Sequence, residues 1–407
     1  MDVDKLVKSA RKALNEFSNL DIGAKNKFLL DVIASIKNNI NIVLEKNRED
    51  IIANINLPSP TLDRLKLNES IINNICIDNT IMLKKEDIIG NVIERRYLNS
   101  GVLLEKTIVP FGVVLAIFEA RPNALIDISL MALKTSNVVI LKGGKEAINT
   151  NIKLVEIIKD CAINNSINPN IVSLITSSDR CITNELLENS MIDLVIPRGS
   201  KKLIDYVKTN SKIPYIETGA GVCHIYIESS ASIDMAMKII YNAKCVKSAV
   251  CNSVETILID DSIAKNVLDE LVEVLNKVKL RGCLKTNKYI NVEQTTDDDY
   301  YSEYNDLIVN IKIVDNYLEA IEHINKYSTK HSDAIISSDL LVSEYFLNNV
   351  DSACVYHNAS TRFSDGGCFG FGCEVGISTQ KLHVRGPMGL DTLTTYKYKL
   401  KGNGEIR

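Results

Sequence analysis

One cysteine of the chain has sequence neighbours that suit a reactive thiol. The sequence holds ten cysteines, and Cys251 is the one flanked by polar, turn-forming residues directly before a predicted buried strand at 254–259. A nucleophilic thiolate needs a low pKa, solvent access and nearby N–H donors, and a loop beside a ligand cleft can supply these. Cys251 is therefore the candidate nucleophile. The alternative is a packing residue, since most cysteines inside cells have that role.

Three strand-to-helix turns carry polar and charged residues that their apolar surroundings do not require. These turns are EARPN at 119–123, LKGGKE at 141–146 and IPRGS at 196–200. Free N–H groups at the start of a helix favour anions. The side chain of Asn123 could donate a hydrogen bond to an oxyanion, and Lys142 could supply a point charge for a phosphate. The turn with Gly199 and Ser200 suits a dinucleotide pyrophosphate or ribose.

Each of these turns also has a simpler interpretation. The first could be a helix cap with a surface arginine, a Gly-Gly turn alone is weak evidence, and many strand-to-helix turns look like the third. The chain has no GxGxxG fingerprint and no Walker loop, which disfavours a standard Rossmann or P-loop site. It has no CxxC pair, which disfavours a zinc site. No histidine stands beside a serine in a nucleophile-elbow motif, so a Ser-His hydrolase has no support.

Alternating strands and helices must position these turns. Strands are predicted at 112–118, 138–141, 171–175, 194–196, 225–227 and 254–259, and helices at 122–133, 146–161, 201–209 and 232–243. This alternation predicts an α/β fold with parallel sheets and crossover helices. Such sheets bind ligands beyond the carboxyl ends of their strands. Two β-rich runs around Asn99-Ser100-Gly101 indicate a hairpin, and the Thr, Tyr and Lys pattern of 392–400 is typical of an edge strand.

Composition excludes several classes of function. The chain has 407 residues, 24% of them charged, and a net charge of −4, which is ordinary for a globular protein of two or three domains. The mildly acidic net charge argues against nucleic-acid binding, which would need clustered Lys and Arg on a basic domain. No run of about 18 apolar residues could span a bilayer, and the N-terminus has helical rather than signal-peptide character. We therefore expect a cytoplasmic protein with free thiols, no metal and no membrane partner.

Together these segments resemble the aldehyde dehydrogenase superfamily. Their order is strand–Pro–Asn, strand–Lys–Gly, a Gly-Ser turn, the run ETGAG at 217–221, and then the cysteine. The closest resemblance is to the branch that reduces γ-glutamyl phosphate in proline biosynthesis, and it covers essentially the whole chain. The matching runs are FEARPN (118–123), DLVIPRG (193–199), ETGAGVCH (217–224), VCNSVET (250–256), NASTRFSDG (358–366) and FGFGCEVGISTQKLHVRGPMGL (369–390).

The resemblance implies a reaction and its catalytic residues. γ-Glutamyl 5-phosphate would be reduced by NADPH to glutamate 5-semialdehyde, with release of phosphate, through a thioester on Cys251. Asn123 would hold the oxyanion. The residue matching Glu217 activates water in hydrolytic relatives, and here it would orient the cofactor or move a proton. Two positions depart from the expected pattern, because Ser248 replaces a proline and Val222 an asparagine.

The resemblance also implies binding residues. Lys142, Gly199 and Ser200 would contact the adenosine side of NADPH, and Glu303 the nicotinamide ribose. Lys142 or Lys145 would provide the cation for the 2′-phosphate. Arg121 and Arg362 are candidates for the anionic groups of the substrate, and structural ion pairs are the alternative for both.

The resemblance extends to domains and assembly. It implies a cofactor-binding domain at 1–91 and 111–221, a catalytic domain at 222–384, and an oligomerisation flap at 92–110 and 385–407. We expect a homodimer or homotetramer, linked in function to a separate glutamate 5-kinase, since no kinase portion is attached.

Two other functions remain open on the sequence alone. A thioester-forming aldehyde dehydrogenase that makes an acid or an acyl-CoA would share the fold and Cys251. A catalytically inactive member kept as a binding protein is the rival of a different class, although the set of Asn123, Glu217 and Cys251 is intact.

Overall fold

The chain forms two compact α/β units in the computed structural model, which describes residues 2–407. Unit 1 comprises the residues up to Thr218 together with Gly370–Gly376 and Met388–Arg407. Unit 2 comprises Gly219–Phe369 and Ile377–Pro387. The chain therefore passes from one unit to the other inside the ETGAG run, with Glu217 in unit 1 and Gly221 in unit 2.

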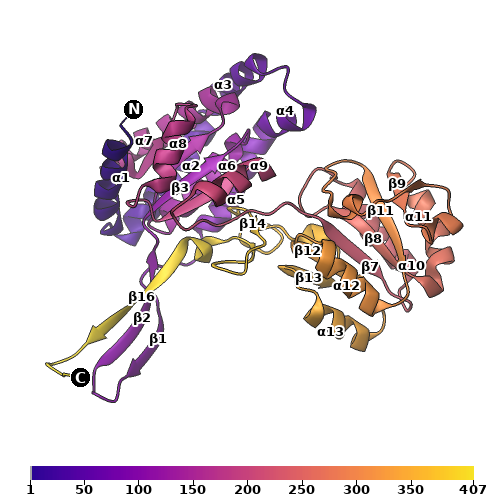
Figure 1. Ribbon diagram of the computed structural model, residues 1–407. Coiled ribbons are helices and arrows are strands. Elements are labelled where there is room, and N and C mark those ends of the chain that lie inside the picture. Colours follow the sequence, from indigo (N-terminus) through magenta and orange to yellow (C-terminus); the bar gives the residue numbers. More distant parts are fainter. Residues whose placement is uncertain (1) are drawn as a thin grey trace. The chain divides into compact units, whose positions relative to one another are not determined.

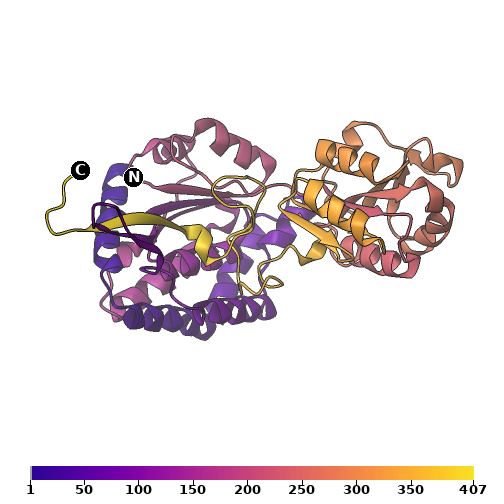
Figure 2. The same ribbon diagram turned by 90° about the horizontal axis from the view of Figure 1, so that it is seen from below.

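A four-stranded parallel sheet forms the centre of unit 1. Its order is β5–β4–β3–β6, with β3 at Val113–Phe118, β4 at Val138–Gly143, β5 at Val172–Leu174 and β6 at Leu194–Arg198. Helices cover both faces of this sheet (Figure 2). All six residues of β3 are buried, because a parallel sheet covered on both sides has no solvated face. The α/β alternation predicted from the sequence is thus confirmed.

The helices predicted in unit 1 at 122–133, 146–161 and 201–209 are present, and their ends differ from the prediction by at most three residues. The helices of unit 1 are α1 (Val3–Ser18), α2 (Ile22–Asn38), α3 (Ile40–Ala53), α4 (Ser59–Leu65), α5 (Glu69–Leu83), α6 (Pro122–Lys134), α7 (Ile148–Asn164), α8 (Arg180–Glu188) and α9 (Lys201–Asn210). Pro122 occupies the first turn of α6, where its missing N–H costs nothing. We did not predict α8 from the sequence. It has nine residues and buries three side chains, so it is shorter than the window of about 11–18 residues over which helical periodicity is counted.

A separate antiparallel sheet of unit 1 joins the predicted hairpin to the end of the chain. It contains β1 (Val92–Tyr97), β2 (Leu103–Pro110) and β16 (Thr394–Lys401), in the order β1–β2–β16. Figure 1 shows β16 in yellow beside β2, both extending from the rest of unit 1. The register pairs Lys397 with Thr107. The hairpin and the edge character of the last strand are confirmed.

Unit 2 is built on a seven-stranded sheet in which all the pairings are parallel. Its order is β10–β9–β11–β8–β7–β12–β13. The strands are β7 (Cys223–Ile227), β8 (Val254–Asp260), β9 (Lys279–Gly282), β10 (Glu293–Gln294), β11 (Ile308–Val314), β12 (Ser332–Ile336) and β13 (Cys354–His357). The helices are α10 (Ile233–Cys245), α11 (Ala264–Val274), α12 (Tyr317–Tyr327) and α13 (Leu340–Asn349). A two-stranded antiparallel ribbon, β14 (Ile377–Ser378) with β15 (Gly386–Pro387), completes the unit.

Strand β7 shows how the sheet of unit 2 is buried on both sides. Ile225 and Ile227 belong to one apolar cluster, which includes residues of α10 and α11. Tyr226, between them in sequence, belongs to a second cluster and stacks on Phe346 of α13. Successive side chains of a strand point to opposite faces. The continuous apolar runs in the sequence therefore correspond to strands with a core on each side.

Within residues 2–407, the structure contains no helix of the length and apolarity that crossing a membrane would require.

Candidate active site

Cys251 lies in the loop between α10 and β8 and is partly exposed. The thiol of Cys223 donates to the backbone carbonyl oxygen of Cys251 at 3.2 Å. On the other side, a Cβ atom added to Gly221 would lie 1.4 Å from the same oxygen. The backbone of the candidate nucleophile is thus held between a buried thiol and a glycine that has no room for a side chain.

Glu303 fixes the glycine that contacts this loop. Its Oε1 atom accepts a hydrogen bond from the backbone N–H of Gly221 at 3.0 Å. The next residue, Val222, is buried and donates its backbone N–H to Thr329 Oγ1 at 3.0 Å. A valine at this position, where the sequence pattern led us to expect asparagine, therefore packs into the core of unit 2.

The three segments meet because of the sheet topology. Gly221, Cys251 and Glu303 each precede one of the strands β7, β8 and β11, which are neighbours in the parallel sheet. Their amino ends consequently lie at one edge. In unit 2 the candidate residues occupy the amino edge of the sheet, whereas ligand sites of open parallel sheets are generally at the carboxyl edge.

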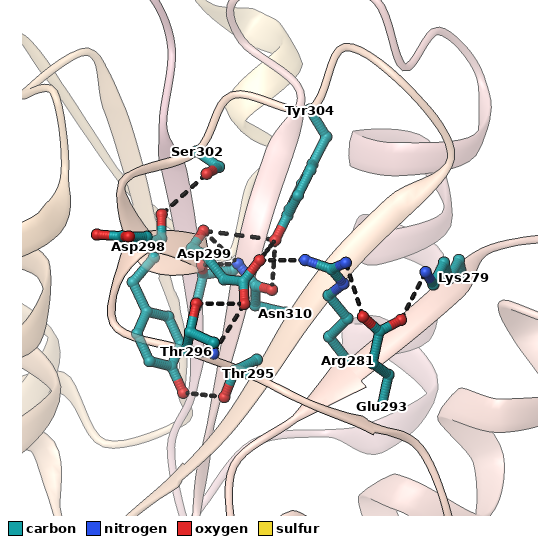
Figure 3. Close-up of polar contacts among 12 residues, drawn as sticks. Lys279, Arg281, Glu293, Thr295, Thr296, Asp298, Asp299, Ser302, Tyr304 and Asn310 are labelled. Carbon is teal, nitrogen blue, oxygen red and sulfur yellow. Dashed lines mark hydrogen bonds and ion pairs between the residues drawn. The ribbon is translucent and has the colours of Figure 1, made fainter.

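A polar network supports the segment that carries Glu303. The guanidinium of Arg281 on β9 lies between the carboxylates of Asp299 and Glu293 (Figure 3). The hydroxyl of Tyr304, next to Glu303, donates to Asp299 Oδ1 at 3.0 Å and to Asn310 Oδ1 at 2.9 Å. This network fixes residue 304, and through it the adjacent Glu303, relative to the sheet.

The residue after the nucleophile is bound by the NASTRFSDG segment. Asn252 is buried, and its Nδ2 atom donates to the carbonyl oxygen of Ser364 at 2.9 Å. Its Oδ1 atom accepts from the guanidinium of Arg362. Thr361 Oγ1 donates to the Asn252 carbonyl oxygen at 2.7 Å. Arg362, predicted as a substrate contact, is thus brought to the Cys251 loop and anchored there. The sequence reasoning missed Asn252, although its place directly after the candidate nucleophile was a signal.

A buried ion pair lies beneath the same loop, and the sequence reasoning missed it as well. Lys244 Nζ and Glu255 Oε2 are 2.8 Å apart, with both side chains fully buried. Burial raises the pKa of Glu255 to about 8, and Lys244 offsets only part of that effect. A carboxylate inside the apolar run of β8 was the available signal. The pair connects the end of α10 to the start of β8, the two elements between which Cys251 lies.

In unit 1 the candidate residues gather at the carboxyl edge of the sheet, as predicted. Glu119 Oε2 accepts from the backbone N–H of Ser200 at 2.7 Å, and Glu119 Oε1 from its hydroxyl at 3.0 Å. A Cβ atom at Gly199 would lie 2.6 Å from the Glu119 carboxylate. Glu146 Oε1 accepts from the backbone N–H of Ala120 at 2.7 Å. The turns after β3, β4 and β6 are therefore joined through two carboxylates.

Lys142 and Asn123 occupy different environments at this edge. Lys142 is buried, its Nζ donates to the Ser177 carbonyl oxygen at 3.1 Å, and desolvation lowers its pKa. Lys145, by contrast, is exposed. Asn123 is partly exposed in the first turn of α6, next to Arg121 at the N-cap.

Glu217 lies at the end of unit 1 before the chain enters unit 2. Its Oε2 atom is 3.8 Å from Lys208 Nζ on α9. This is an ion pair at the limit of contact between partly exposed groups, and such pairs contribute little to stability. The structure thus brings Asn123, Lys142, Gly199, Ser200 and Arg121 to unit 1 with Glu217, and Cys251, Glu303 and Arg362 to unit 2.

The chain is similar to known proteins over its full length. Residues 1–291 match the model of the aldehyde dehydrogenase family. The chain is 44% identical to a γ-glutamyl phosphate reductase of Nautilia profundicola, over 99% of both chains. It superposes on a crystal structure of γ-glutamyl phosphate reductase from Thermotoga maritima with a TM-score of 0.96 and 38% identity, over 100% of both chains. An acetylating aldehyde dehydrogenase from Geobacillus thermoglucosidasius shares the fold, with a TM-score of 0.72 at 16% identity.

The likeness at full length, the two parallel α/β units and the cysteine loop before β8 all lead to one assignment. The chain belongs to the aldehyde dehydrogenase family and, within it, to the γ-glutamyl phosphate reductases.

Proposed function

We propose that this chain reduces L-γ-glutamyl 5-phosphate to L-glutamate 5-semialdehyde with NADPH, releases phosphate, and so serves proline biosynthesis. The observation that carries the proposal is the Cys251 loop, which is partly exposed and is fixed by Gly221, Cys223 and Asn252. The relatives named for this reaction, which match over the full length, support the choice of substrate.

In the proposed mechanism the Cys251 thiolate attacks the γ-carbonyl carbon. A C–S bond forms, the bond from carbon to the phosphate oxygen breaks, and phosphate leaves. Asn123 Nδ2 and the backbone N–H of Cys251 donate to the oxyanion. NADPH, when bound, would supply the hydride that reduces the thioester carbon. The resulting thiohemiacetal anion collapses to the aldehyde and returns the electron pair to sulfur, so the covalent intermediate divides one difficult reduction into two steps.

The turns of unit 1 suit a dinucleotide. Gly143 and Gly144 form the turn at the end of β4, and Ser200 caps α9 beside Gly199, with its Oγ accepting from the backbone N–H of Leu203. The N-terminus of a helix favours anionic groups such as a pyrophosphate. We propose that Lys142, Gly199 and Ser200 bind the adenosine side, and that Lys142 or Lys145 binds the 2′-phosphate. The exposed ammonium group of Lys145 favours Lys145 over the buried Lys142. NADPH affinity should then fall more than NADH affinity in Lys145→Ala.

Glu303 has two separable roles in this proposal. It accepts from Gly221, and it is the proposed contact of the nicotinamide ribose. Glu303→Gln keeps an acceptor for Gly221, while Glu303→Ala removes it. A cofactor role predicts a higher KM for NADPH in both variants, whereas a purely structural role predicts that the glutamine variant behaves as the wild type.

For Glu217 we propose that it orients the cofactor or moves a proton. Unchanged kinetics of Glu217→Gln in both directions would remove it from the mechanism.

For Arg362 we propose an interaction with the phosphate next to Cys251, with its anchoring by Asn252 setting the direction of the guanidinium. Arg121 is the proposed partner of a second anionic group of the substrate.

We propose that the chain acts as a homodimer or homotetramer through the β1–β2–β16 sheet. Its exposed apolar side chains support this, with Tyr97 75% and Ile93 55% exposed. Light scattering of the wild type and of Ile93→Lys tests the assembly, and a single monomeric mass for the wild type would reject it.

The proposed metabolic partner is a separate glutamate 5-kinase, which would supply the acyl phosphate.

The test of the function is the reverse reaction with Cys251→Ser as its control. Glutamate semialdehyde, NADP⁺ and phosphate should give NADPH absorbance that depends on phosphate and is lost in the variant. Reduction of NADP⁺ without a phosphate requirement would indicate a dehydrogenase that forms the acid, and a requirement for coenzyme A one that forms an acyl-CoA. No turnover by folded protein would indicate a binding protein.

A further inference from the structure

Helix α6 is buried except at two polar residues, which are partly exposed and lie on one face. Its thirteen residues run from Pro122 to Lys134, and all of them are buried except Asn123 and Asp127. Residues four apart share a face of a helix, and their Cα atoms are separated by about 6 Å along the axis. Asp127 therefore lies one turn beyond the proposed oxyanion donor, on the same accessible stripe.

Asn79 holds the Asp127 carboxylate in a defined orientation. Its Nδ2 atom donates to Asp127 Oδ1 at 2.7 Å and to the Ile75 carbonyl oxygen at 2.9 Å. Its Oδ1 atom accepts from the Cys373 thiol at 3.6 Å. Asn79 is completely buried, so these contacts leave its amide a single orientation. Among the residues that the structure describes, Asp127 Oδ2 accepts no hydrogen bond, while part of the residue remains accessible.

The charged groups around Asp127 include more carboxylates than cations. The carboxylates of Asp78 on α5 and Glu374 in the returning segment add negative charge, and Arg198 at the end of β6 adds positive charge. Burial raises the pKa of Asp127 to about 7, and Asn79 and Arg198 only partly offset this. A bound cation would stabilise the ionised form, because an opposite charge nearby lowers the pKa of a carboxylate.

A γ-glutamyl group has the length to connect the two residues. Four single bonds of about 1.5 Å each separate its γ-carbonyl carbon from its α-nitrogen, which gives a reach of roughly 5 Å. A substrate whose carbonyl oxygen is bound by Asn123 could thus present its α-ammonium group one turn further along α6. We propose that Asp127 binds the α-ammonium group of the substrate and so selects amino-acid aldehydes and acyl phosphates over their deaminated analogues. This proposal rests on the proposed function, in particular on the role of Asn123.

Two aldehydes that differ only in the ammonium group test the proposal. Reverse turnover with NADP⁺ and phosphate is compared for glutamate 5-semialdehyde and for 5-oxopentanoate, which has the same chain without the amino group. Asp127→Asn should lower kcat/KM for the amino aldehyde at least tenfold and leave that for 5-oxopentanoate within twofold. Each variant is compared with the wild type on the same aldehyde, so cyclisation of the semialdehyde cancels.

A matched control removes one carboxylate elsewhere in unit 1. Asp160→Asn changes an exposed residue of α7 and should leave both aldehydes unaffected. An equal loss on both aldehydes in Asp127→Asn would make Asp127 a structural residue, and unchanged selectivity would mean that it does not contact the ammonium group. Either result overturns the ammonium site alone. Failure of the wild type to turn over either aldehyde overturns the proposed function and the ammonium site with it.

Discussion

A Cβ atom on Gly221 would lie 1.4 Å from the carbonyl oxygen of Cys251, a separation that no pair of non-bonded atoms can adopt. Gly221, near the start of unit 2, and the candidate nucleophile are therefore in direct backbone contact. Every residue with a side chain is excluded at position 221 unless the Cys251 loop moves.

Gly221→Ala should consequently displace the nucleophile. We expect a large loss of kcat and a decrease in stability of about 1–3 kcal/mol, because overpacking forces the backbone to shift. Enzyme assays and thermal unfolding measure the two effects. Gly23→Ala is the control, since Gly23 lies in the first turn of α2 and its Cβ would meet the carboxylate of Asp21, the N-cap of that helix, and no backbone atom. Wild-type activity of Gly221→Ala would show that the loop is not confined.

Asn252 should be essential for the conformation of the loop. Asn252→Ala leaves the carbonyl oxygen of Ser364 and the guanidinium of Arg362 without their partner, which typically costs about 1–3 kcal/mol for buried groups. Asn252→Asp keeps an acceptor for Arg362 and should retain more of the activity. Equal effects of the two substitutions on kcat and on urea unfolding would contradict this account.

The stability of Asp127→Asn should exceed that of the wild type at alkaline pH. The pKa of Asp127 is raised to about 7 in the fold against about 3.9 in the unfolded chain. Its contribution to stability is therefore complete below pH 3.9 and is lost as the pH rises toward 7. The variant avoids that loss, so we expect it to be about 1–3 kcal/mol more stable at pH 8, with the advantage shrinking toward pH 4.5. Denaturation at both pH values measures the difference, and a destabilised variant at pH 8 would refute it.

Asp351 should show the opposite dependence on pH. Lys330, Lys381 and Arg385 each lie 2.9–3.0 Å from its carboxylate oxygens, and hydrogen bonds to these cations, Lys330 foremost, lower its pKa. A lowered folded pKa gives stability that is present above the unfolded value and is lost as the pH falls through the folded one. Asp351→Asn should thus be destabilised by about 1 kcal/mol at pH 7, and this difference should shrink as the pH falls from about 4 toward about 2. A constant difference across this range would exclude the ion pairs as the cause.

The same contacts explain part of the run GISTQKLHVRGPMGL at 376–390, which the sequence analysis identified only as a matching segment. Lys381 and Arg385 are its basic residues, and they attach the segment around β14 and β15 to the turn before β13. Their role in the structure is to form ion pairs with Asp351 and so to hold this segment against the rest of unit 2. Charge pairs between residues distant in sequence leave no periodic pattern, so the sequence could not indicate this partner.

Residue types and their order determined the α/β class, the turns after β3, β4 and β6, and Cys251 as the candidate nucleophile. The reason is local, because continuous apolar runs specify buried parallel strands and Pro or Gly marks where they end. Tertiary structure alone decided that Gly221, Cys251 and Glu303 share one edge, that Arg362 is anchored on Asn252, and that Asn123 and Asp127 form the accessible face of α6. Those relationships depend on strand order and on which helix face is covered. Long-range packing sets both, and the local spacing of residues does not encode them.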